Sequence, residues 1–549
     1  MKLIVGIDFG TSTTVVRYRE EGTDVIQSLT IDNGKSGIIP TVIFRPKDGC
    51  TEYGMQAIQR YNNGIEGELC INFKMDLLNP EKRAEAENNI IDFLTFIHSL
   101  FEEQTKTLHP DTMDVYISYP AKWSDDMVTF MKTAVETAGF KGYGVKVKGM
   151  REPQAASLNM LHEYKQQLQQ ANVLVYGKPL RVFMLDMGAG TSDISIFKLD
   201  VDHDGGIKIS ELLSYPSISE PVLCGGREID ASMQRYFVDM CKDKGFELMP
   251  DCVEPVGIKS WKENTLSKEL KLGDSVSSLP SNVALFLKMM KRNDIINGFS
   301  INRNDFERVT GTHWKRLCKL IQSALAQYRF AGPEDIDLVF LTGGHSNWYV
   351  VPNLFTGKGL SDGTGLPGEL DFKKIKAEPE LRMTSLNNDR PHECVARGLC
   401  FAGEHVEFEP RSANNVWAKI TICGEGGECV QVVNKDGVLP QTQHVEFERT
   451  VARNLVFGNL EFDAGIDIYT GESFDKAEKR HCKLSTDEGS IIGRLFVSLF
   501  VLTLFFSADY TVSVSMDVTM TEEGQLKIDG VFKLDNKETK FTEQGLVTA

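Results

Sequence analysis

Hydrophobic residues in the first third of the chain alternate between strand-like runs and helical stripes. Strands are predicted at Leu3–Ile7, Asp114–Tyr119 and Val145–Lys148, where apolar and β-branched residues gather in short runs. Between the first two, Asn88–Phe101 is predicted to be a helix, because its apolar residues recur every three or four positions. Strands that alternate with helices in this way indicate an α/β fold in which helices cover the sheets.

The same alternation returns in the middle of the chain. Strands are predicted at Val182–Leu185 and Ile194–Leu199, and a further apolar strand is expected at Ile336–Leu341. Residues 245–335 have a mainly helical pattern, with a β-like piece near Asn282–Met289. The middle of the chain therefore looks like a second α/β unit related to the first.

The pattern changes again near the C-terminus, where helical periodicity disappears. Apolar and polar residues alternate strictly along Tyr510–Met520, which predicts a strand of a β-hairpin. We therefore expect a two-lobed α/β domain over residues 1–404, with the lobes at about 1–180 and 181–404. An all-β module is expected over residues 411–549.

Composition narrows the class of protein. The 549 residues carry a net charge of −17, from 60 basic and 77 acidic side chains, which disfavours nucleic-acid binding through bulk electrostatics. The eleven Cys include no CxxC pair, and a strand-like N-terminus leaves no room for a signal peptide, so a cytoplasmic location is expected. The apolar run Ile491–Phe506 contains Arg494 and is shorter than the roughly 20 residues of a membrane-spanning helix. It is predicted to be buried β structure, and no membrane partner is expected.

One short motif occurs twice, each time between two predicted strands. It reads Asp-Phe-Gly-Thr-Ser at Asp8–Ser12 and Asp-Met-Gly-Ala-Gly-Thr-Ser-Asp at Asp186–Asp193. Glycine lets the backbone approach an anion closely, and successive N–H groups in such a turn form an anion-binding nest. Asp8 and Asp186 would repel phosphate unless a cation lay between them, and Mg²⁺ is commonly held through carboxylates and substrate phosphates. A single copy is also compatible with an ordinary β-turn, but two copies favour a nucleotide site between related halves.

Five segments in order resemble the actin, sugar-kinase and heat-shock ATPase superfamily. Besides the two turns they are Arg151–Ala156, Gly225–Asp230 and Leu341–Ser346. Within that superfamily the chain is most similar to the DnaK-type seventy-kilodalton heat-shock chaperones, through its Glu-Pro-x-Ala-Ala and Gly-Gly-x-x-x-Asp segments. The resemblance implies a two-lobed actin-like (duplicated ribonuclease H-like) ATPase domain over 1–404, and only a similar architecture over 411–549.

The resemblance also implies a role for each site residue. Asp8 and Asp186 would hold hydrated Mg²⁺ through water, while Lys74, Glu152, Asp193 and Thr191 would surround the attacking water, the phosphates and the cations. The remaining nucleotide contacts would come from four segments and one lysine: Gly10, Thr11, Ser12 and Thr13; Gly188, Ala189 and Gly190; Gly225, Gly226 and Arg227; Lys271; and Gly343, Gly344 and His345. ATP or ADP and Mg²⁺ are the implied cofactors, with K⁺ as a further candidate.

The chain departs from the family pattern at the base end of the site and in its C-terminal part. His345 and Asn347 replace a Ser and an adenine-stacking Arg, and His392 replaces an acid. Ala189 replaces the middle Gly of the second turn, and Lys268 stands where an acid before Lys271 is expected. The family's helical lid is missing before the chain stops, so the module looks like a lidless substrate-binding domain.

The leading functional hypothesis is an ATP-binding, slowly ATP-hydrolysing molecular switch with chaperone-like client binding. Its partners would be a polypeptide client and a co-chaperone or exchange factor. Three alternatives stay open: an actin-like or cytoskeletal filament ATPase, a kinase acting on a small metabolite, and a nucleotide-binding scaffold with little turnover. Phosphoryl transfer needs positioning and charge neutralisation more than covalent help, which suits the acids and the lysine found here.

Overall fold

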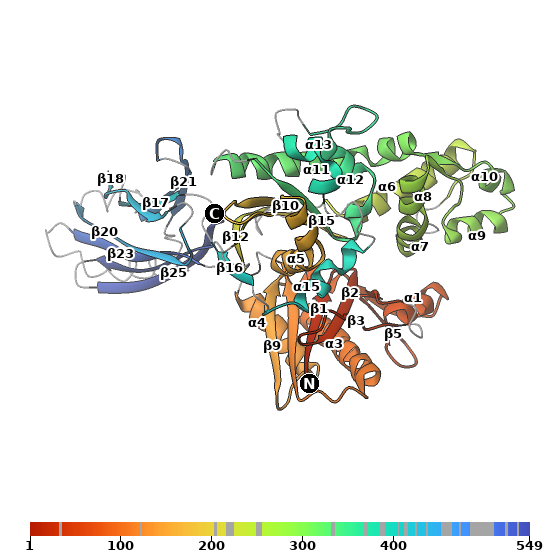
Figure 1. Cartoon of the computed structure of the whole chain (residues 1–549), viewed down its shortest axis with the longest axis horizontal. Coiled ribbons are helices and arrows are strands. Elements are labelled where there is room, and N and C mark those ends of the chain that lie inside the picture. The colour runs from red at the N-terminus through yellow and green to blue at the C-terminus, as the bar shows by residue number, and fades with distance from the viewer. Residues whose placement is uncertain are drawn as a thin grey trace, which may run out of the picture. The chain divides into compact units, whose positions relative to one another are not determined.

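A computed structural model gives the structure of the chain (Figure 1). It describes residues 1–31, 36–120, 123, 125–201, 206–215, 224–248, 255–330, 335–366, 372–383, 390–403, 406–410, 415–422, 425–434, 437–451, 464–471, 474–483, 510–521, 525–534 and 537–548. The chain divides into two compact units. The first comprises residues 1–207, 214–323 and 335–406, and the second comprises 208–213, 324–334 and 407–549.

The helices and strands follow one another in the order expected of an α/β protein with a strand-rich C-terminal part. The helices are α1 (Gly54–Asn62), α2 (Phe73–Asp76), α3 (Arg83–Thr105), α4 (Asp125–Thr137), α5 (Glu152–Gln170), α6 (Gly226–Asp243), α7 (Pro255–Trp261), α8 (Ser267–Leu272), α9 (Ser281–Met289), α10 (Asn293–Asn297), α11 (Arg303–Phe330), α12 (Val350–Thr356), α13 (Lys373–Ala377), α14 (Pro379–Arg382) and α15 (Cys394–Leu399). The strands are β1 (Lys2–Phe9), β2 (Thr13–Glu20), β3 (Gln27–Ser28), β4 (Ile39–Pro40), β5 (Val42–Pro46), β6 (Glu52–Tyr53), β7 (Gly67–Ile71), β8 (Thr112–Tyr119), β9 (Val145–Arg151), β10 (Leu180–Met187), β11 (Ser192–Val201), β12 (Ile207–Tyr215), β13 (Ser275–Val276), β14 (Ile301–Asn302), β15 (Leu338–Thr342), β16 (Val406–Pro410), β17 (Asn415–Ile422), β18 (Glu425–Gly426), β19 (Val430–Val433), β20 (Gln441–Val451), β21 (Ala464–Gly471), β22 (Glu478–Lys483), β23 (Tyr510–Met520), β24 (Gln525–Leu534) and β25 (Lys537–Thr548).

Two sheets of the first unit repeat one topology. In the first sheet, β1 pairs antiparallel with β2 and parallel with β8, and β9 continues the sheet in parallel. In the second sheet, β10 pairs antiparallel with β11 and parallel with β15. Each repeated motif lies in the turn of a β-hairpin whose first strand has a parallel neighbour. The fold is therefore the actin-like α/β architecture predicted from the sequence.

Helix α3 covers the first sheet as its periodicity predicts. Ile90, Phe93, Leu94 and Ile97 are fully buried and join Phe9, Val5 and Ile7 of β1 in one hydrophobic core. Apolar side chains spaced three and four residues apart share one face of a helix, so this face turns toward the sheet. The sheet and helix together hold the first motif at the end of β1.

Helices α5 and α15 pack closely against each other (Figure 1). Their contact depends on Gly398, because a methyl group at that position would lie 1.7 Å from the carbonyl oxygen of Ala155. Ala155 and Ala156 are themselves fully buried. Small residues on both helices therefore allow their backbones to touch.

One secondary-structure prediction in the first unit is wrong. The β-like piece near Asn282–Met289 is the helix α9, which begins directly after Pro280. Its two buried residues, Val283 and Leu287, are four positions apart and so share a helical face. A short apolar run fits either a strand or a helix by its pattern, and here tertiary packing decides for the helix.

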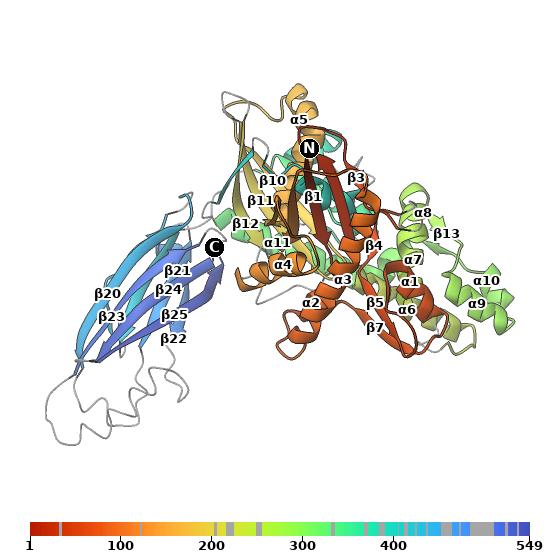
Figure 2. The same ribbon diagram turned by 90° about the horizontal axis from the view of Figure 1, so that it is seen from below.

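The second unit contains two antiparallel sheets with a common hydrophobic core. One sheet has the order β20-β23-β24-β25, whose strands lie side by side in Figure 2, and the other contains β18-β17-β21-β22. Alternate residues of β23, from Val512 to Met520, are buried and meet buried residues of β17 such as Ile420. The hairpin predicted for Tyr510–Met520 is thus confirmed as β23 and β24.

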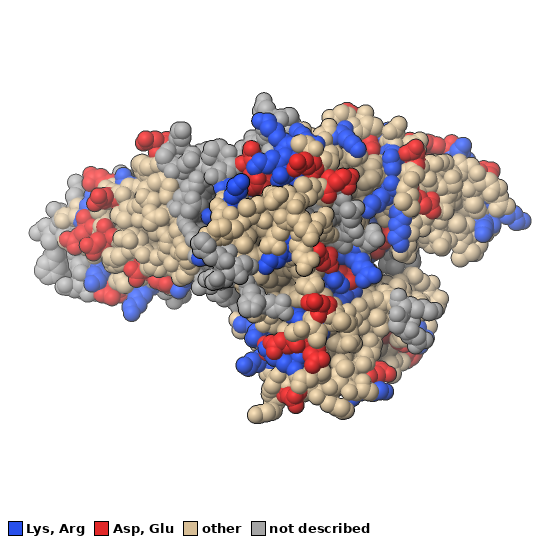
Figure 3. Space-filling model, in the orientation of Figure 1, with Lys and Arg blue, Asp and Glu red and all other residues tan. Residues whose placement is uncertain are grey.

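Two further features concern the surface and the membrane prediction. No helix in the described ranges is both long and apolar enough to cross a membrane. The apolar run Ile491–Phe506 lies outside the described residues. Acidic and basic side chains are interspersed on the described surface seen in Figure 3.

Replacing Gly398 by Ala should destabilise the protein, because the added methyl group has no room between α5 and α15. Overpacking of this kind costs about 1–3 kcal/mol or more in the free energy of unfolding. The matched control is Gly311→Ala in α11, where a methyl group would meet no described atom within 4 Å. That change should stabilise the helix by about 0.5–1 kcal/mol. Urea denaturation of both variants measures the difference, and equal effects would contradict the packing argument.

Candidate nucleotide site

The two repeated turns have the same hydrogen-bonded geometry. The backbone N–H of Gly10 donates to the carbonyl oxygen of Thr13 at 3.1 Å. In the second copy the N–H of Gly188 donates to the carbonyl oxygen of Thr191 at 3.0 Å. Each turn therefore closes a hairpin in the same way, and turns of this kind can offer further backbone N–H groups to an anion.

The turns line a cavity of about 820 Å³ in the first unit. A volume of this size suits a nucleotide-sized ligand. Most residues predicted for the site line it: Asp8, Gly10, Thr11, Ser12, Thr13, Lys74, Glu152, Asp186, Gly188, Ala189, Gly190, Thr191, Asp193, Lys271, Gly343, Gly344 and His345. Gly225, Gly226 and Arg227 are absent from this lining, although they contact the second turn.

Carboxylates gather on the floor of the cavity. Burial, and then the charge of Glu152, raise the pKa of Asp8 to about 7, although Lys74 and a hydrogen bond from Ser118 oppose the shift. The Ser118 hydroxyl donates to Asp8 Oδ1 at 2.9 Å. Burial raises the pKa of Asp186 well above its usual range, with further contributions from Glu152, Asp193 and Asp8. The acids repel one another, so the cluster favours a proton or a cation.

Lys74 is the basic group of this acidic cluster. Its ammonium donates to Glu152 Oε1 at 2.8 Å and lies 5.5 Å from the centre of the Trp123 ring. Lys74 is 5 % exposed, so its charge acts in a poorly solvated place. Thr191 completes the group by donating to Asp193 Oδ2 at 3.2 Å. The structure therefore brings Lys74, Glu152 and the second turn together, although they are far apart in sequence.

The Gly225–Arg227 segment supports the second turn through backbone hydrogen bonds. The N–H of Gly226 donates to the carbonyl oxygen of Gly188 at 3.2 Å, and that of Arg227 donates to the carbonyl oxygen of Ala189 at 2.9 Å. The Arg227 guanidinium also donates to the Asn72 side chain beside Lys74. This segment thus fixes the shape of the turn that follows Asp186.

His345 follows the paired glycines at the other end of the cavity. Gly343 has a φ of +79°, and a methyl group there would lie 2.4 Å from Asp186 Oδ1, so only glycine fits comfortably. The His345 ring lies against Gly226, since a methyl group at Gly226 would be 1.7 Å from His345 Nε2. Burial lowers the pKa of His345 well below its usual range, and Lys262 adds to the effect. The imidazole is therefore neutral at physiological pH.

Sequence reasoning missed two lysines that line the cavity. Lys259 donates to the Ser12 hydroxyl at 3.0 Å, and Lys262 pairs with Asp230 Oδ1 at 2.7 Å. Lys262 begins a π-helical turn over Lys262–Leu266, and such turns are frequent at functional sites. In the sequence, Lys259 and Lys262 stand out only as basic residues at helical spacing near Lys271. Such spacing is also common on solvated helix faces.

Two related halves that place matching Asp and hydroxyl turns on one cavity define a two-lobed actin-like nucleotide-binding domain. The model of the Hsp70 protein family matches residues 92–355 of the chain. The chain is similar to the chaperone protein DnaK of Mycoplasmopsis synoviae, with 24% identity over 355 residues, and to that of Mycoplasma mobile, with 24% over 343 residues. The alignments cover 64% and 62% of this chain and 54% and 51% of the relatives, so the chain spans about half the length of the curated relatives it matches.

A third relative, the chaperone protein DnaK of Mesomycoplasma hyopneumoniae strain J, is 25% identical over 356 residues. The alignment covers 64% of this chain and 54% of the relative. The family match, these relatives and the fold agree with one another. Together they support a divergent member of the Hsp70 family.

The acidic floor of the cavity predicts a pH-dependent penalty in the protein without nucleotide or metal. Asp8 has a pKa of about 7 in the folded state, above its ordinary value of 3.8. The unfolded state therefore binds fewer protons between these pH values, and stability should fall as pH rises through this window. Asp8→Asn removes the penalty and keeps an acceptor for Ser118.

Urea denaturation in the presence of a chelator should show this effect. The stability gained by Asp8→Asn should be larger at pH 8 than at pH 5 by about 1–3 kcal/mol. Asp48→Asn, at an exposed position, controls for the loss of a carboxylate. A gain from Asp8→Asn that is the same at both pH values would contradict a raised pKa.

Proposed function

We propose that this chain is a Mg²⁺-dependent, slowly ATP-hydrolysing, chaperone-like molecular switch. The observation that supports it most directly is the pair of matching turns, each following an acid, around a cavity that also holds Lys74 and Glu152. Similarity to the Hsp70 family supports a chaperone-like nucleotide-binding protein. The catalytic roles of individual residues belong to the proposal.

The residues present fit a hydrated Mg²⁺ ion and a polyphosphate. Asp8 and Asp186 have raised pKa values because burial and neighbouring acids disfavour their charges, and a divalent cation would relieve that repulsion. Bound there through water, Mg²⁺ would neutralise phosphate charge during transfer. The backbone N–H groups of the Gly10–Thr13 and Gly188–Thr191 turns would bind the phosphate oxygens.

Lys74 and Glu152 would act at the γ-phosphate. Their 2.8 Å ion pair holds the ammonium in a fixed place, from which it would offset phosphate charge and orient the attacking water. Glu152 begins α5, and its carboxylate would accept a hydrogen bond from that water. Lys74 lies in α2 and Glu152 lies in α5, so the geometry of the ion pair depends on the relative position of these two helices.

The base end of the site would bind the nucleoside differently from that of a family member with a stacking arginine. His345, Asn347 and His392 line the cavity there. His345 is neutral and packed against Gly226, so it supplies shape and one hydrogen-bonding nitrogen in place of positive charge. We therefore propose that affinity comes mainly from the phosphate end.

Lys74→Ala should slow Mg²⁺-dependent ATP hydrolysis by about 10²-fold or more, as expected for loss of a group that stabilises transition-state charge. The control is Lys82→Ala, whose side chain is 59% exposed and pairs with Asp76 at 3.6 Å. Phosphate release under single-turnover conditions measures both rates, and nucleotide affinity measured in parallel separates binding from catalysis. Equal rates in the two variants would sink the assignment of Lys74.

Wild-type protein that binds ATP but does not hydrolyse it would favour the nucleotide-binding scaffold instead. This second candidate is supported by His345, Asn347 and His392, which line the cavity and depart from the family pattern. Sedimentation of the chain with ATP distinguishes the filament alternative, because only a filament protein would pellet as a polymer.

The second unit is proposed to bind an unfolded polypeptide client. Its two sheets share a core, as the alternation of apolar and polar residues along their strands requires, and the family's substrate-binding module is also rich in β structure. Fluorescence anisotropy of a labelled, permanently unfolded polypeptide should show faster release with ATP than with ADP, and identical release would refute nucleotide control.

A further inference from the structure

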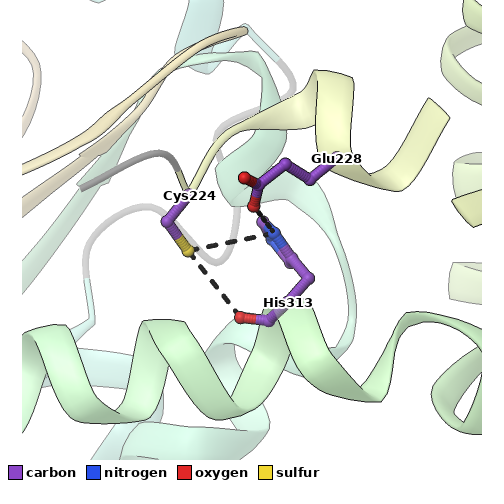
Figure 4. Close-up of side chains that lie close together, drawn as sticks. All are labelled: Cys224, Glu228 and His313. Carbon is purple, nitrogen blue, oxygen red and sulfur yellow. Dashed lines mark hydrogen bonds and ion pairs between the residues drawn. The ribbon is translucent and has the colours of Figure 1, made fainter. Parts of the chain in front are cut away.

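Three metal-ligating side chains converge behind the candidate nucleotide site. Cys224 lies two residues before the start of α6, Glu228 lies in the first turn of α6, and His313 comes from α11 (Figure 4). One ligand atom from each lies within 4.8 Å of the others. Cys224 and His313 are buried, and Glu228 is partly exposed.

Two separations within this cluster are close to those of ligands around one tetrahedral zinc ion. Cys224 Sγ lies 3.8 Å from His313 Nδ1, which lies 3.4 Å from Glu228 Oε2. Zinc bond lengths to sulfur, nitrogen and oxygen imply separations of about 3.6 Å and about 3.3 Å at tetrahedral angles. The third pair, the Cys224 sulfur and the Glu228 oxygen, lies within 4.8 Å, so a small approach of these two side chains would let all three bind one ion.

The surroundings of the cluster also suit a metal ion. Glu228 uses its other oxygen, Oε1, to accept from Arg316 at 3.0 Å, which orients the carboxylate and leaves Oε2 toward His313. The second ring nitrogen of His313, Nε2, is buried and has no hydrogen-bond partner among the described residues. Nδ1 is therefore the ring nitrogen that lies toward Cys224 and Glu228.

We propose that Cys224, Glu228 and His313 form a binding site for a divalent transition metal, with zinc the best match to one sulfur, one nitrogen and one oxygen ligand. The thiol proton of Cys224 would leave to solvent as Sγ becomes a ligand. A water molecule would complete the tetrahedron on the partly exposed side of Glu228. This site is separate from the predicted Mg²⁺ site and does not rest on the proposed ATPase activity.

A metal ion here would stiffen the loop that supports the second phosphate turn. Gly225, Gly226 and Arg227 lie between two of the ligands in the chain, and two of them donate to the carbonyls of Gly188 and Ala189. Tying Cys224 and Glu228 to α11 would restrict this loop at both ends. The zinc ion would therefore act as a structural brace for the candidate nucleotide site.

Cobalt and zinc titrations of the metal-free full chain test the proposal without nucleotide. Co²⁺ should bind with about one equivalent and give the near-ultraviolet absorption of a thiolate-to-cobalt charge transfer, and Zn²⁺ should displace it. Cys224→Ser should abolish the charge-transfer band, and Glu228→Gln should weaken affinity by about tenfold or more while the protein stays folded. Cys241→Ser, which removes another buried thiol on α6, should bind like the wild type.

Three outcomes would overturn the proposal. The first is that the wild type binds no stoichiometric metal ion, and the second is that Co²⁺ binds without the charge-transfer band. The third is that metal binding survives in both the Cys224→Ser and the Glu228→Gln variants. Circular dichroism melting of each variant identifies any that fail to fold, and Glu228→Gln keeps the test decisive because its side chain is partly exposed. Metal stoichiometry and the charge-transfer band do not depend on ATP hydrolysis, so failure of the ATPase proposal can be distinguished from failure of the metal-site proposal.

Discussion

Mutual repulsion among the carboxylates of the cavity is the constraint around which the first unit is organised. Burial and neighbouring acids, Glu152 among them, raise the pKa values of Asp8 and Asp186, and the charge of Lys74 opposes the shift at both. A cluster of this kind is costly in an empty protein and becomes favourable when cations arrive. Folding must therefore hold acids together that would separate if they were free.

The duplicated topology supplies the required rigidity. Asp8 and Asp186 end central strands, each of which has an antiparallel hairpin partner and a parallel neighbour. These strands cannot shift register by one residue without turning their buried faces outward. The position of both acids is thus fixed by the cores of the two sheets, and the close contact of α5 with α15 keeps Glu152 on the same cavity.

The sequence was sufficient to predict the parts of this arrangement that are local or repeated. Hairpins around Asp8 and Asp186, the buried face of α3 and the alternation in β23 follow from periodicity and turn residues. By contrast, Asn282–Met289 was predicted to be β-like, because an apolar run of that length has no decisive period. Lys259 and Lys262 escaped notice for a different reason. Lys259 contacts Ser12 and Lys262 contacts Asp230, and both partners are distant in sequence. The helical spacing of the two lysines is also that of an ordinary solvated helix face.

The resemblance predicted residue identities more securely than it predicted how those residues support one another. Gly225, Gly226 and Arg227 are predicted to approach the nucleotide, and in the structure Gly226 and Arg227 donate hydrogen bonds to the turn that follows Asp186. His345 packs on Gly226, so it is connected through that glycine to the second turn. A side chain at position 226 would collide with the His345 ring. The part of the cavity that His345 lines and the second turn are therefore coupled through one loop, and whatever restrains that loop will act on both.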